Sequence, residues 1–384
     1  MREKFTALQF EFKTVILPFF GSRIFLAMVG LLSPLIRASD QYPIKLAVER
    51  AWQFTPYRLL DMWARWDSGW YYSIAANGYV PSEAGGQSNL AFFPLYPYLI
   101  RASNFFLLNF REHRTTFTLI GVVISNLAFL GALLILAKIL KQLKFSDGFT
   151  RNTIWVVLIF PLGFFFSTLL TESLLLFLVL AVVWSCIKHN WLLCAVAASL
   201  AMIARPLGQF IIIPIVISYL VQNKGKILWK EILPFAMVPL TFFGYIWTLY
   251  LISGDWFAVL NVRAAWSHNP SLPWQTLFFI DPYHPTLSYL NISIVIGMII
   301  LCVIYIWKYP HKEWGVWGLL MTILPLFLGS SDSIGRYSLM AFPAFIALNG
   351  LLENKPELRR WAEMVMIALQ VLLFIGWVRF YWVG

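Results

Sequence analysis

Residues 117–137 read FTLIGVVISNLAFLGALLILA, a mostly apolar run that contains no charged side chain. A helix needs about 20 mostly apolar residues to cross the hydrocarbon core of a bilayer, which is about 30 Å thick. The run therefore predicts a membrane-spanning helix and places the chain among the integral membrane proteins.

The composition extends this conclusion to the whole chain. Of its 384 residues, 60% are hydrophobic and only 12% are charged, whereas about a quarter of the residues of a soluble domain are charged. The mean hydropathy of +0.72 is typical of a protein with many spans. The net charge of +11 is explained by basic cytoplasmic loops, so no nucleic-acid partner is expected.

Further apolar segments predict an all-α polytopic protein with about eleven transmembrane helices. Several segments are short, so these helices would have to tilt or end against protein and cavities. No internal repeat or long linker divides the chain, so residues 1–384 are expected to form a single membrane domain. The candidate spans are about 14–36, 117–137, 153–168, 172–187, 191–204, 209–222, 231–252, 288–307, 314–329, 337–352 and 361–382.

Two smaller features follow from the same runs. No small-residue cleavage site follows the first span, which is therefore predicted to be an uncleaved anchor. Cys186, Cys194 and Cys302 lie in apolar runs and lack the spacing of metal ligands, so they are expected to be buried thiols.

The distribution of lysine predicts which ends of the spans face the cytoplasm. With the N-terminus in the cytoplasm and the spans alternating, every lysine except Lys45 obeys the positive-inside rule. A span at 90–108 would reverse this order downstream, so that segment is predicted to be a helix at the outer face. The lysines on the cytoplasmic side are Lys4, Lys13, Lys138, Lys141, Lys144, Lys188, Lys224, Lys226, Lys230, Lys308, Lys312 and Lys355.

With this orientation, unusual ionisable residues collect on the outer face. The first large outer loop, at about 37–116, holds Asp67, and the second, at about 253–287, holds His268. Glu172, Arg205 and Arg336 fall at outer turns or at the outer end of a span. Charges at membrane depth are costly and usually face a cavity or one another, so we predict a site on this face.

The segment Arg65-Trp66-Asp67-Ser68-Gly69-Trp70-Tyr71-Tyr72 suggests the chemistry of that site. It places one carboxylate among aromatic rings that can stack on the faces of sugars. A carboxylate can take the proton of an attacking sugar hydroxyl, which typically raises the rate about 10²–10⁴-fold. We therefore expect Asp67 to be a general base, with the rings of Trp66, Trp70 and Tyr71 in contact with substrate.

A lipid-linked sugar donor would also need a cation for its phosphate. The planar guanidinium pairs bidentately with phosphate and stays charged, which makes Arg205 and Arg336 the candidates. With arginine in this role, neither a divalent metal nor another cofactor is expected, and no Asp-x-Asp motif occurs.

Each candidate also has a purely structural interpretation. Asp67 could be the N-cap of a helix from Trp70 to Ala76, and Glu172 could cap the helix 173–187. Arg205 could reach lipid headgroups, and His268 could be solvated in its loop. Most tryptophans are expected to be ordinary residues of the membrane interface.

Five short motifs carry a resemblance to a known family. They are WDSGWY at 66–71, FFPLYP at 92–97, TESL at 171–174, ARPLG at 204–208 and GRY at 335–337. Together they resemble the GPI mannosyltransferase II family, the PIG-V-like group of GT-C glycosyltransferases. The resemblance covers most of the chain and is more specific before about residue 220. Eukaryotic members typically have a large acidic or histidine residue near the position of Gly69, so this compact chain is more similar to a bacterial member.

The resemblance implies a GT-C fold with a catalytic acid in the first external loop. It implies a polyprenyl-phosphate hexose donor, mannose in particular, and an inverting, metal-independent transfer to a glycan, lipid or protein acceptor. It adds Tyr337, together with Glu172, Arg205 and Arg336, to the substrate-binding residues, and His268 joins them from its position in the second outer loop. The implied location is the bacterial inner membrane, with the active site on the external face.

Two other functions compete with this one. A transporter or flippase of a lipid-linked sugar would have broken helices and paired repeats, and Pro161, Pro214, Pro239 and Pro325 do interrupt spans. A membrane acyltransferase or hydrolase would need a buried histidine, but none of the five histidines lies within a predicted span.

Overall fold

The structure is a computed structural model that describes residues 8–36, 53–81, 86–108, 113–266, 270–282 and 284–383. Throughout these ranges the regular elements are helices, which confirms the all-α class. The α-helices are α2 (Leu17–Leu32), α4 (Arg58–Asp61), α5 (Ser68–Asn77), α6 (Leu95–Leu108), α7 (Arg114–Gln142), α8 (Asp147–Ile159), α9 (Glu172–Ile187), α10 (Trp191–Met202), α11 (Ile212–Gln222), α12 (Trp229–Ile232), α13 (Met237–Ser253), α14 (Ala258–Asn261), α15 (Pro273–Phe278), α16 (Pro285–Lys308), α17 (Lys312–Ile323), α18 (Ile334–Ser338), α19 (Phe342–Leu352) and α20 (Pro356–Val378).

Within the described residues, 5 helical stretches are long and apolar enough to cross a membrane: Leu8–Leu35, Arg114–Gln142, Trp229–Ser253, Pro285–Lys308 and Pro356–Val378. Shorter apolar helices lie at Glu172–Ile187, Trp191–Met202, Pro206–Gln222 and Phe342–Leu352. The helices lie where the sequence predicts spans, while the number of crossings, eleven, stays a prediction.

Several of the candidate spans are not continuous α-helices, among them 153–168 and 314–329. α8 ends at Ile159, two residues before Pro161, and the chain then turns through a buried 3-10 helix, Gly163–Ser167. α17 likewise ends at Ile323 and continues as a short 3-10 helix that contains Pro325. Proline lacks the amide hydrogen of the helix ladder and clashes with the preceding turn, so it ends the regular helix in both places.

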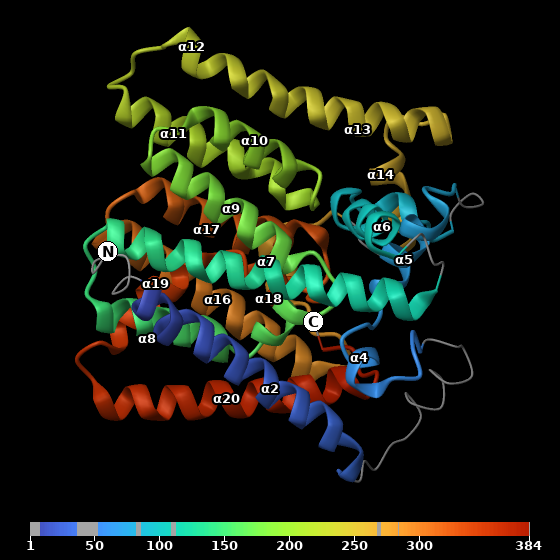
Figure 1. Cartoon of the computed structure of the whole chain (residues 1–384), viewed down its shortest axis with the longest axis horizontal. Helices are drawn as coiled ribbons and strands as arrows, with labels where there is room; N and C mark the ends of the chain where they lie inside the picture. Colours follow the sequence, from blue (N-terminus) through green and yellow to red (C-terminus); the bar gives the residue numbers. More distant parts are fainter. Residues whose placement is uncertain are drawn as a thin grey trace.

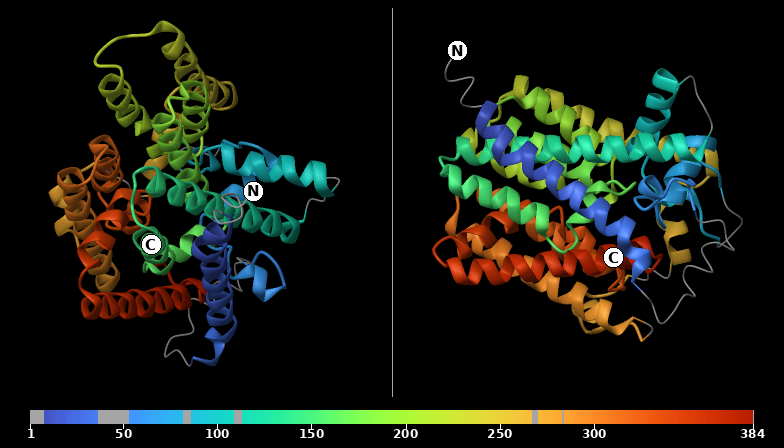
Figure 2. Two further views of the ribbon diagram at one scale, coloured as in Figure 1. Left: turned by 60° about the vertical axis from the view of Figure 1, so that its left-hand side comes forward. Right: turned by 60° about the horizontal axis from the view of Figure 1, so that its bottom comes forward.

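The core forms around α7, which packs against α9, and α9 packs against α10. Gly131 of α7 allows this approach, because a Cβ there would lie 2.8 Å from the ring of Phe177. Small residues at such interfaces are typical of membrane helices. A second group of helices forms around α16, which packs against α17 and α19. The left panel of Figure 2 shows α16–α20 in orange and red, apart from α10–α13 in green and yellow.

The two ends of the helical bundle differ in character. In Figure 1 the turns α7–α8, α11–α12 and α19–α20 lie at the left, and these turns carry Lys144, Lys224, Lys226 and Lys355. The short helices α4, α5, α6 and α14 gather at the opposite end (Figure 1). Lysine-bearing turns and the first large loop therefore lie at opposite ends, as the lysine distribution predicts. Which end faces the cytoplasm stays a prediction.

The segment 90–108 contains a helix, α6, that leaves large apolar side chains on the surface. Phe105 is 59% exposed and Phe106 is 79% exposed. Exposed aromatic side chains on a short helix are typical of a membrane interface. The cysteines Cys186, Cys194 and Cys302 are all buried and free, as expected.

Candidate functional site

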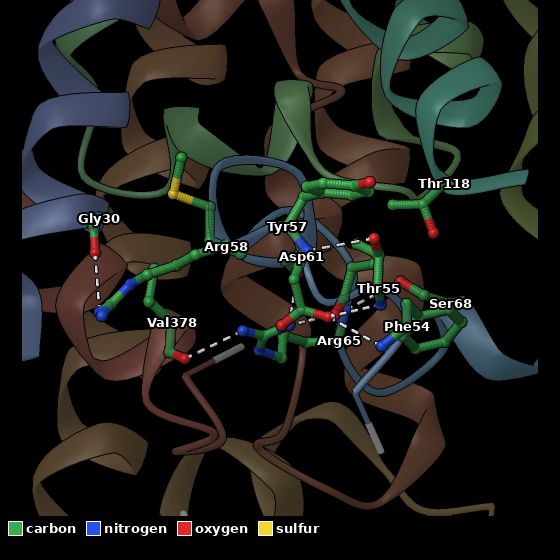
Figure 3. Close-up of polar contacts among 12 residues, drawn as sticks. Gly30, Phe54, Thr55, Tyr57, Arg58, Asp61, Arg65, Ser68, Thr118 and Val378 are labelled. Carbon is green, nitrogen blue, oxygen red and sulfur yellow. Dashed lines mark hydrogen bonds and ion pairs between the residues drawn. The ribbon is translucent and has the colours of Figure 1, made fainter. Parts of the chain in front are cut away.

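The loop that carries Asp67 rests on a buried ion pair between Asp61 and Arg65 (Figure 3). Arg65 Nη1 lies 2.8 Å from Asp61 Oδ2, and Asp61 Oδ1 accepts hydrogen bonds from the amides of Phe54, at 2.8 Å, and Thr55, at 3.2 Å. Arg65 also donates to the carbonyl of Val378, at 3.2 Å. The loop is thereby fixed both to the preceding segment and to the end of α20.

The backbone of this loop is bent sharply immediately before Asp67. Trp66 has φ of 52°, in the left-handed region that costs an L-residue about 1–2 kcal/mol. The hydroxyl of Ser68 accepts a hydrogen bond from the amide of Arg65, at 3.1 Å, and donates to the carbonyl of Leu169, at 3.1 Å. Asp67 occupies the N-cap position of α5, but its side chain makes no capping hydrogen bond. The carboxylate of Asp67 therefore does not cap α5 and makes its contacts elsewhere.

The carboxylate of Asp67 joins a cluster of four charges drawn from distant parts of the chain. Arg336 Nη2 lies 2.9 Å from Asp67 Oδ2, and Arg336 Nε lies 3.2 Å from Glu172 Oε1. The same oxygen of Glu172 lies 2.6 Å from Arg205 Nη1. Two carboxylates and two guanidiniums make the cluster neutral in total. These are four of the residues that the sequence predicts to face one another, and the structure brings them together.

Most of the cluster is hidden from solvent, and its exposed end is Asp67. The side chain of Glu172 is 1% exposed and those of Arg205 and Arg336 are each 6% exposed, whereas that of Asp67 is 21% exposed. The guanidinium of Arg205 also lies over the ring of Tyr337, 4.3 Å from its centroid. Buried charges are tolerated only when they are well paired. The arrangement thus holds the Asp67 carboxylate firmly while leaving it accessible.

A cavity of about 180 Å³ opens in front of the cluster. Tyr71 and Tyr337 both line it, and their predicted role in binding substrate stays a prediction. Tyr71 Oη lies 3.4 Å from Thr171 Oγ1, and burial raises the pKa of the Tyr71 phenol above its ordinary value. Tyr71 is therefore a neutral hydroxyl that can donate a hydrogen bond. The full lining of this smaller cavity is Asp67, Tyr71, Ala91, Phe92, Phe93, Ala204, Arg205, Pro206, Arg263, Asp332, Ser333, Arg336, Tyr337 and Trp382.

A larger cavity of about 790 Å³ also borders Asp67. Trp66 and Trp70 line this larger cavity, and the ring of Trp70 stacks on that of Phe92 with centroids 5.8 Å apart. Asp67, Asp332 and Trp382 line both cavities and are their shared wall. The full lining of the larger cavity is Phe54, Trp66, Asp67, Gly69, Trp70, Tyr72, Ser73, Gln87, Arg114, Asp281, His284, Asp332, Phe380 and Trp382.

The remaining predictions divide as follows. His268 lies outside the described residues, so its role stays a prediction.

Arg263, Asp332 and Trp382 line the site although the sequence did not single them out. Their positions in the sequence were the available signal. Asp332 lies three residues before the GRY motif, and Arg263 lies in the second predicted outer loop. Over the described ranges, no three histidine, cysteine or acidic side chains converge in a way that could hold a metal ion.

The buried Asp61–Arg65 pair is expected to stabilise the loop that carries Asp67, and a variant of Asp61 tests this. Asp61→Ala is expected to lower stability by about 3–5 kcal/mol, because it leaves a buried guanidinium without its carboxylate. The thermal midpoint of the purified protein in detergent measures the effect. Asp147→Ala is the control, because the Asp147–Lys141 pair has side chains that are 66% and 46% exposed. Equal midpoints for the two variants would contradict a supporting role for Asp61.

The glycine of the ARPLG motif allows the turn with Arg205 to lie directly on α10. A Cβ at Gly208 would stand 1.9 Å from the carbonyl oxygen of Ala201, so Gly208→Ala is expected to cost about 1–3 kcal/mol and to displace Arg205. Gly244→Ala is the matched control, because nothing lies within 4 Å of a Cβ there. A Gly208→Ala protein with an unchanged thermal midpoint would disprove this packing argument.

Comparison with known proteins gives this site a context. The model of a family described as Mannosyltransferase (PIG-V) matches residues 23–223. No curated protein is similar enough in sequence to count as a relative. ArnT from Cupriavidus metallidurans bound to undecaprenyl phosphate has a TM-score of 0.52 at 13% identity, over 87% of this chain and 63% of that one.

Two further structures are similar at lower scores. ArnT from the same organism in the apo state has a TM-score of 0.51 at 15% identity, over 86% of this chain and 62% of that one. The oligosaccharyltransferase of Archaeoglobus fulgidus in the apo form has a TM-score of 0.47 at 12% identity, over 95% of this chain and 56% of that one. This chain therefore spans less than two thirds of the length of each. The likeness to ArnT confirms the predicted GT-C fold.

Proposed function

Because the chain belongs to the mannosyltransferase (PIG-V) family, we propose that it transfers a hexose, namely mannose, from a polyprenyl phosphate to an acceptor hydroxyl. The observation that carries the proposal is the position of Asp67. Asp67 lines both a small cavity with three arginines and a larger cavity with aromatic walls. One carboxylate can therefore contact two substrates, one in each cavity.

The donor occupies the smaller cavity in this proposal, because Arg205, Arg263 and Arg336 line that cavity and make it the more cationic of the two. Cations there stabilise the charge that grows on the leaving phosphate. The acceptor occupies the larger cavity, where Trp66 and Trp70 offer flat faces for a sugar or another ring-shaped group.

The reaction then needs one proton transfer. The acceptor hydroxyl attacks the anomeric carbon as Asp67 takes its proton. A new glycosidic bond forms, the bond from the anomeric carbon to the phosphate oxygen breaks, and polyprenyl phosphate leaves with the bonding electrons. Attack from the side opposite the phosphate inverts the anomeric centre. The residues present suffice for these steps, so we propose a reaction without a metal or another cofactor.

The donor class has support from the fold. ArnT, which shares the fold, has been solved with undecaprenyl phosphate, and the family name supports mannose. We place the site on the external face of a bacterial inner membrane, because the lysine-bearing turns lie at the other end of the bundle (Figure 1). Family membership favours an enzyme over a flippase of the same lipid-linked sugar.

The test uses the purified protein in liposomes with synthetic polyprenyl-phospho-[¹⁴C]mannose as donor. Lipids and glycans extracted from cells that lack the gene serve as acceptors. Label that moves into an extracted acceptor with release of polyprenyl phosphate is the expected result. Transfer from a polyprenyl-phospho-glucose donor at the higher rate would overturn the choice of mannose. Movement of the intact donor across the bilayer, with no transfer, would favour the flippase.

A further inference from the structure

The smaller cavity contains one arginine that the ion-pair cluster does not use. Arg263 belongs to a 3-10 helix, Val262–Trp266, in the second predicted outer loop. Its side chain lines the smaller cavity but not the larger one. Among the residues that the structure describes, no carboxylate lies within ion-pair distance of Arg263. Its guanidinium therefore borders the cavity without an ion-pair partner among the described residues, and the one acid of that lining outside the ion-pair cluster is Asp332.

The other two arginines of the cavity are already engaged. Arg205 lies 2.6 Å from Glu172, and Arg336 lies 3.2 Å from Glu172 and 2.9 Å from Asp67. A phosphate that approached either guanidinium would be repelled by the carboxylate bound to it. Because the four charges sum to zero, the cluster as a whole offers an anion little net attraction.

The negative charge on the phosphate increases during the reaction, so a cation beside it becomes more important. A polyprenyl-phospho-sugar is a phosphodiester with one negative charge, and the polyprenyl phosphate that leaves is a monoester with about −1.5 to −2 charges at neutral pH. A group that stabilises the transition state must meet this growing charge at the place where it develops. An unpaired guanidinium on the donor side of the wall meets that requirement, and its planar fork can bind two phosphate oxygens.

The position of Arg263 is defined by packing as well as by charge. Its 3-10 helix packs against the segment Asn89–Ala91, which leads directly into the FFPLYP motif. Val262 and Phe92 pack against the same small core, which contains Tyr245 and Phe93. Ala91, Phe92 and Phe93 line the smaller cavity as well. Arg263 and the aromatic wall of this cavity are therefore parts of one packed unit.

We propose that Arg263 is the residue that binds the phosphate of the donor and then of the leaving polyprenyl phosphate. Arg205 and Arg336 instead hold the carboxylates of Glu172 and Asp67 in place. This assignment rests on the proposed function, since it names the phosphate ligand of that same site.

The experiment measures binding apart from catalysis. Purified protein in nanodiscs is titrated with synthetic short-chain polyprenyl phosphate, and the fluorescence of the tryptophans, which include Trp382 in the cavity wall, reports binding. Loss of a charge-assisted hydrogen bond typically weakens binding by about 10–100-fold, so Arg263→Gln should weaken it by that factor, and Arg263→Lys should weaken it less. Neutral polyprenol should bind the wild type and both variants equally.

Arg151→Gln is the control, because Arg151 is exposed on α8 and lines neither cavity. Its affinity for polyprenyl phosphate should equal that of the wild type. If the wild type bound no polyprenyl phosphate, the donor class of the proposed function would fall, and the assignment of Arg263 with it. If the wild type bound it and Arg263→Gln bound it equally well, only the assignment of Arg263 would be overturned. Equal weakening of polyprenol and polyprenyl phosphate would show a structural role instead.

Discussion

Asp67→Asn is expected to lower the rate of hexose transfer by about 10²–10⁴-fold, because an amide cannot take the proton of the acceptor hydroxyl. The amide keeps the size of the carboxylate and can keep the 2.9 Å hydrogen bond from Arg336. Binding of polyprenyl phosphate and the thermal midpoint should therefore change much less than the rate. The measurement is single-turnover transfer from polyprenyl-phospho-[¹⁴C]mannose.

Two other carboxylates serve as comparisons for Asp67. Asp332 lines both cavities, so Asp332→Asn tests whether the second acid on the shared wall is the base instead. Asp281 lines only the larger cavity and lies 3.0 Å from His284, so Asp281→Asn should retain most of the rate. Wild-type transfer by Asp67→Asn, together with inactive Asp332→Asn, would move the general base to Asp332.

Glu172→Gln is expected to abolish transfer and to destabilise the protein by about 3–5 kcal/mol. Glu172 pairs with both Arg205 and Arg336, so its loss leaves two buried guanidiniums with the single carboxylate of Asp67. Their repulsion should displace Arg336 and with it the base. Thermal midpoints in detergent and transfer rates measure the two effects.

A matched pair of variants separates charge from packing at Glu172. Glu357→Gln removes one partner of the Glu357–Arg360 pair, whose side chains are 74% and 71% exposed, and it should change the midpoint very little. The double variant Glu172→Leu/Arg205→Leu removes a cation together with the anion, so it should be more stable than Glu172→Gln alone. A Glu172→Gln protein as stable as Glu357→Gln would contradict the buried cluster.

The sequence predicts the members of this cluster because of the cost of charge in a membrane. Asp67, Glu172, Arg205 and Arg336 stand out as ionisable residues beside apolar runs, and the lysine distribution places them on one face. The pairing could not be predicted. Which guanidinium meets which carboxylate depends on how α5, α9 and α18 pack, and neighbours in the sequence do not determine that packing.

Other features of the site are invisible in the sequence for related reasons. The left-handed backbone of Trp66 is unusual for a bulky residue, and it immediately follows the buried Asp61–Arg65 pair. Arg263 resembles any loop arginine until the structure places it on the wall of a cavity. The turn after Ile159 ends a candidate span early, because the apolar pattern continues through Pro161 where the helix does not.

The wall shared by the two cavities affects which residues of the site can change when such proteins evolve new substrates. On this wall Asp67 is paired with Arg336, which is paired in turn with Glu172, so a change in one of these residues must be matched by a change in its partner. The aromatic lining around Trp66 and Trp70 belongs to the larger cavity alone. We therefore expect mutation to find new acceptors on that lining first, while the machinery that cleaves the donor is inherited unaltered.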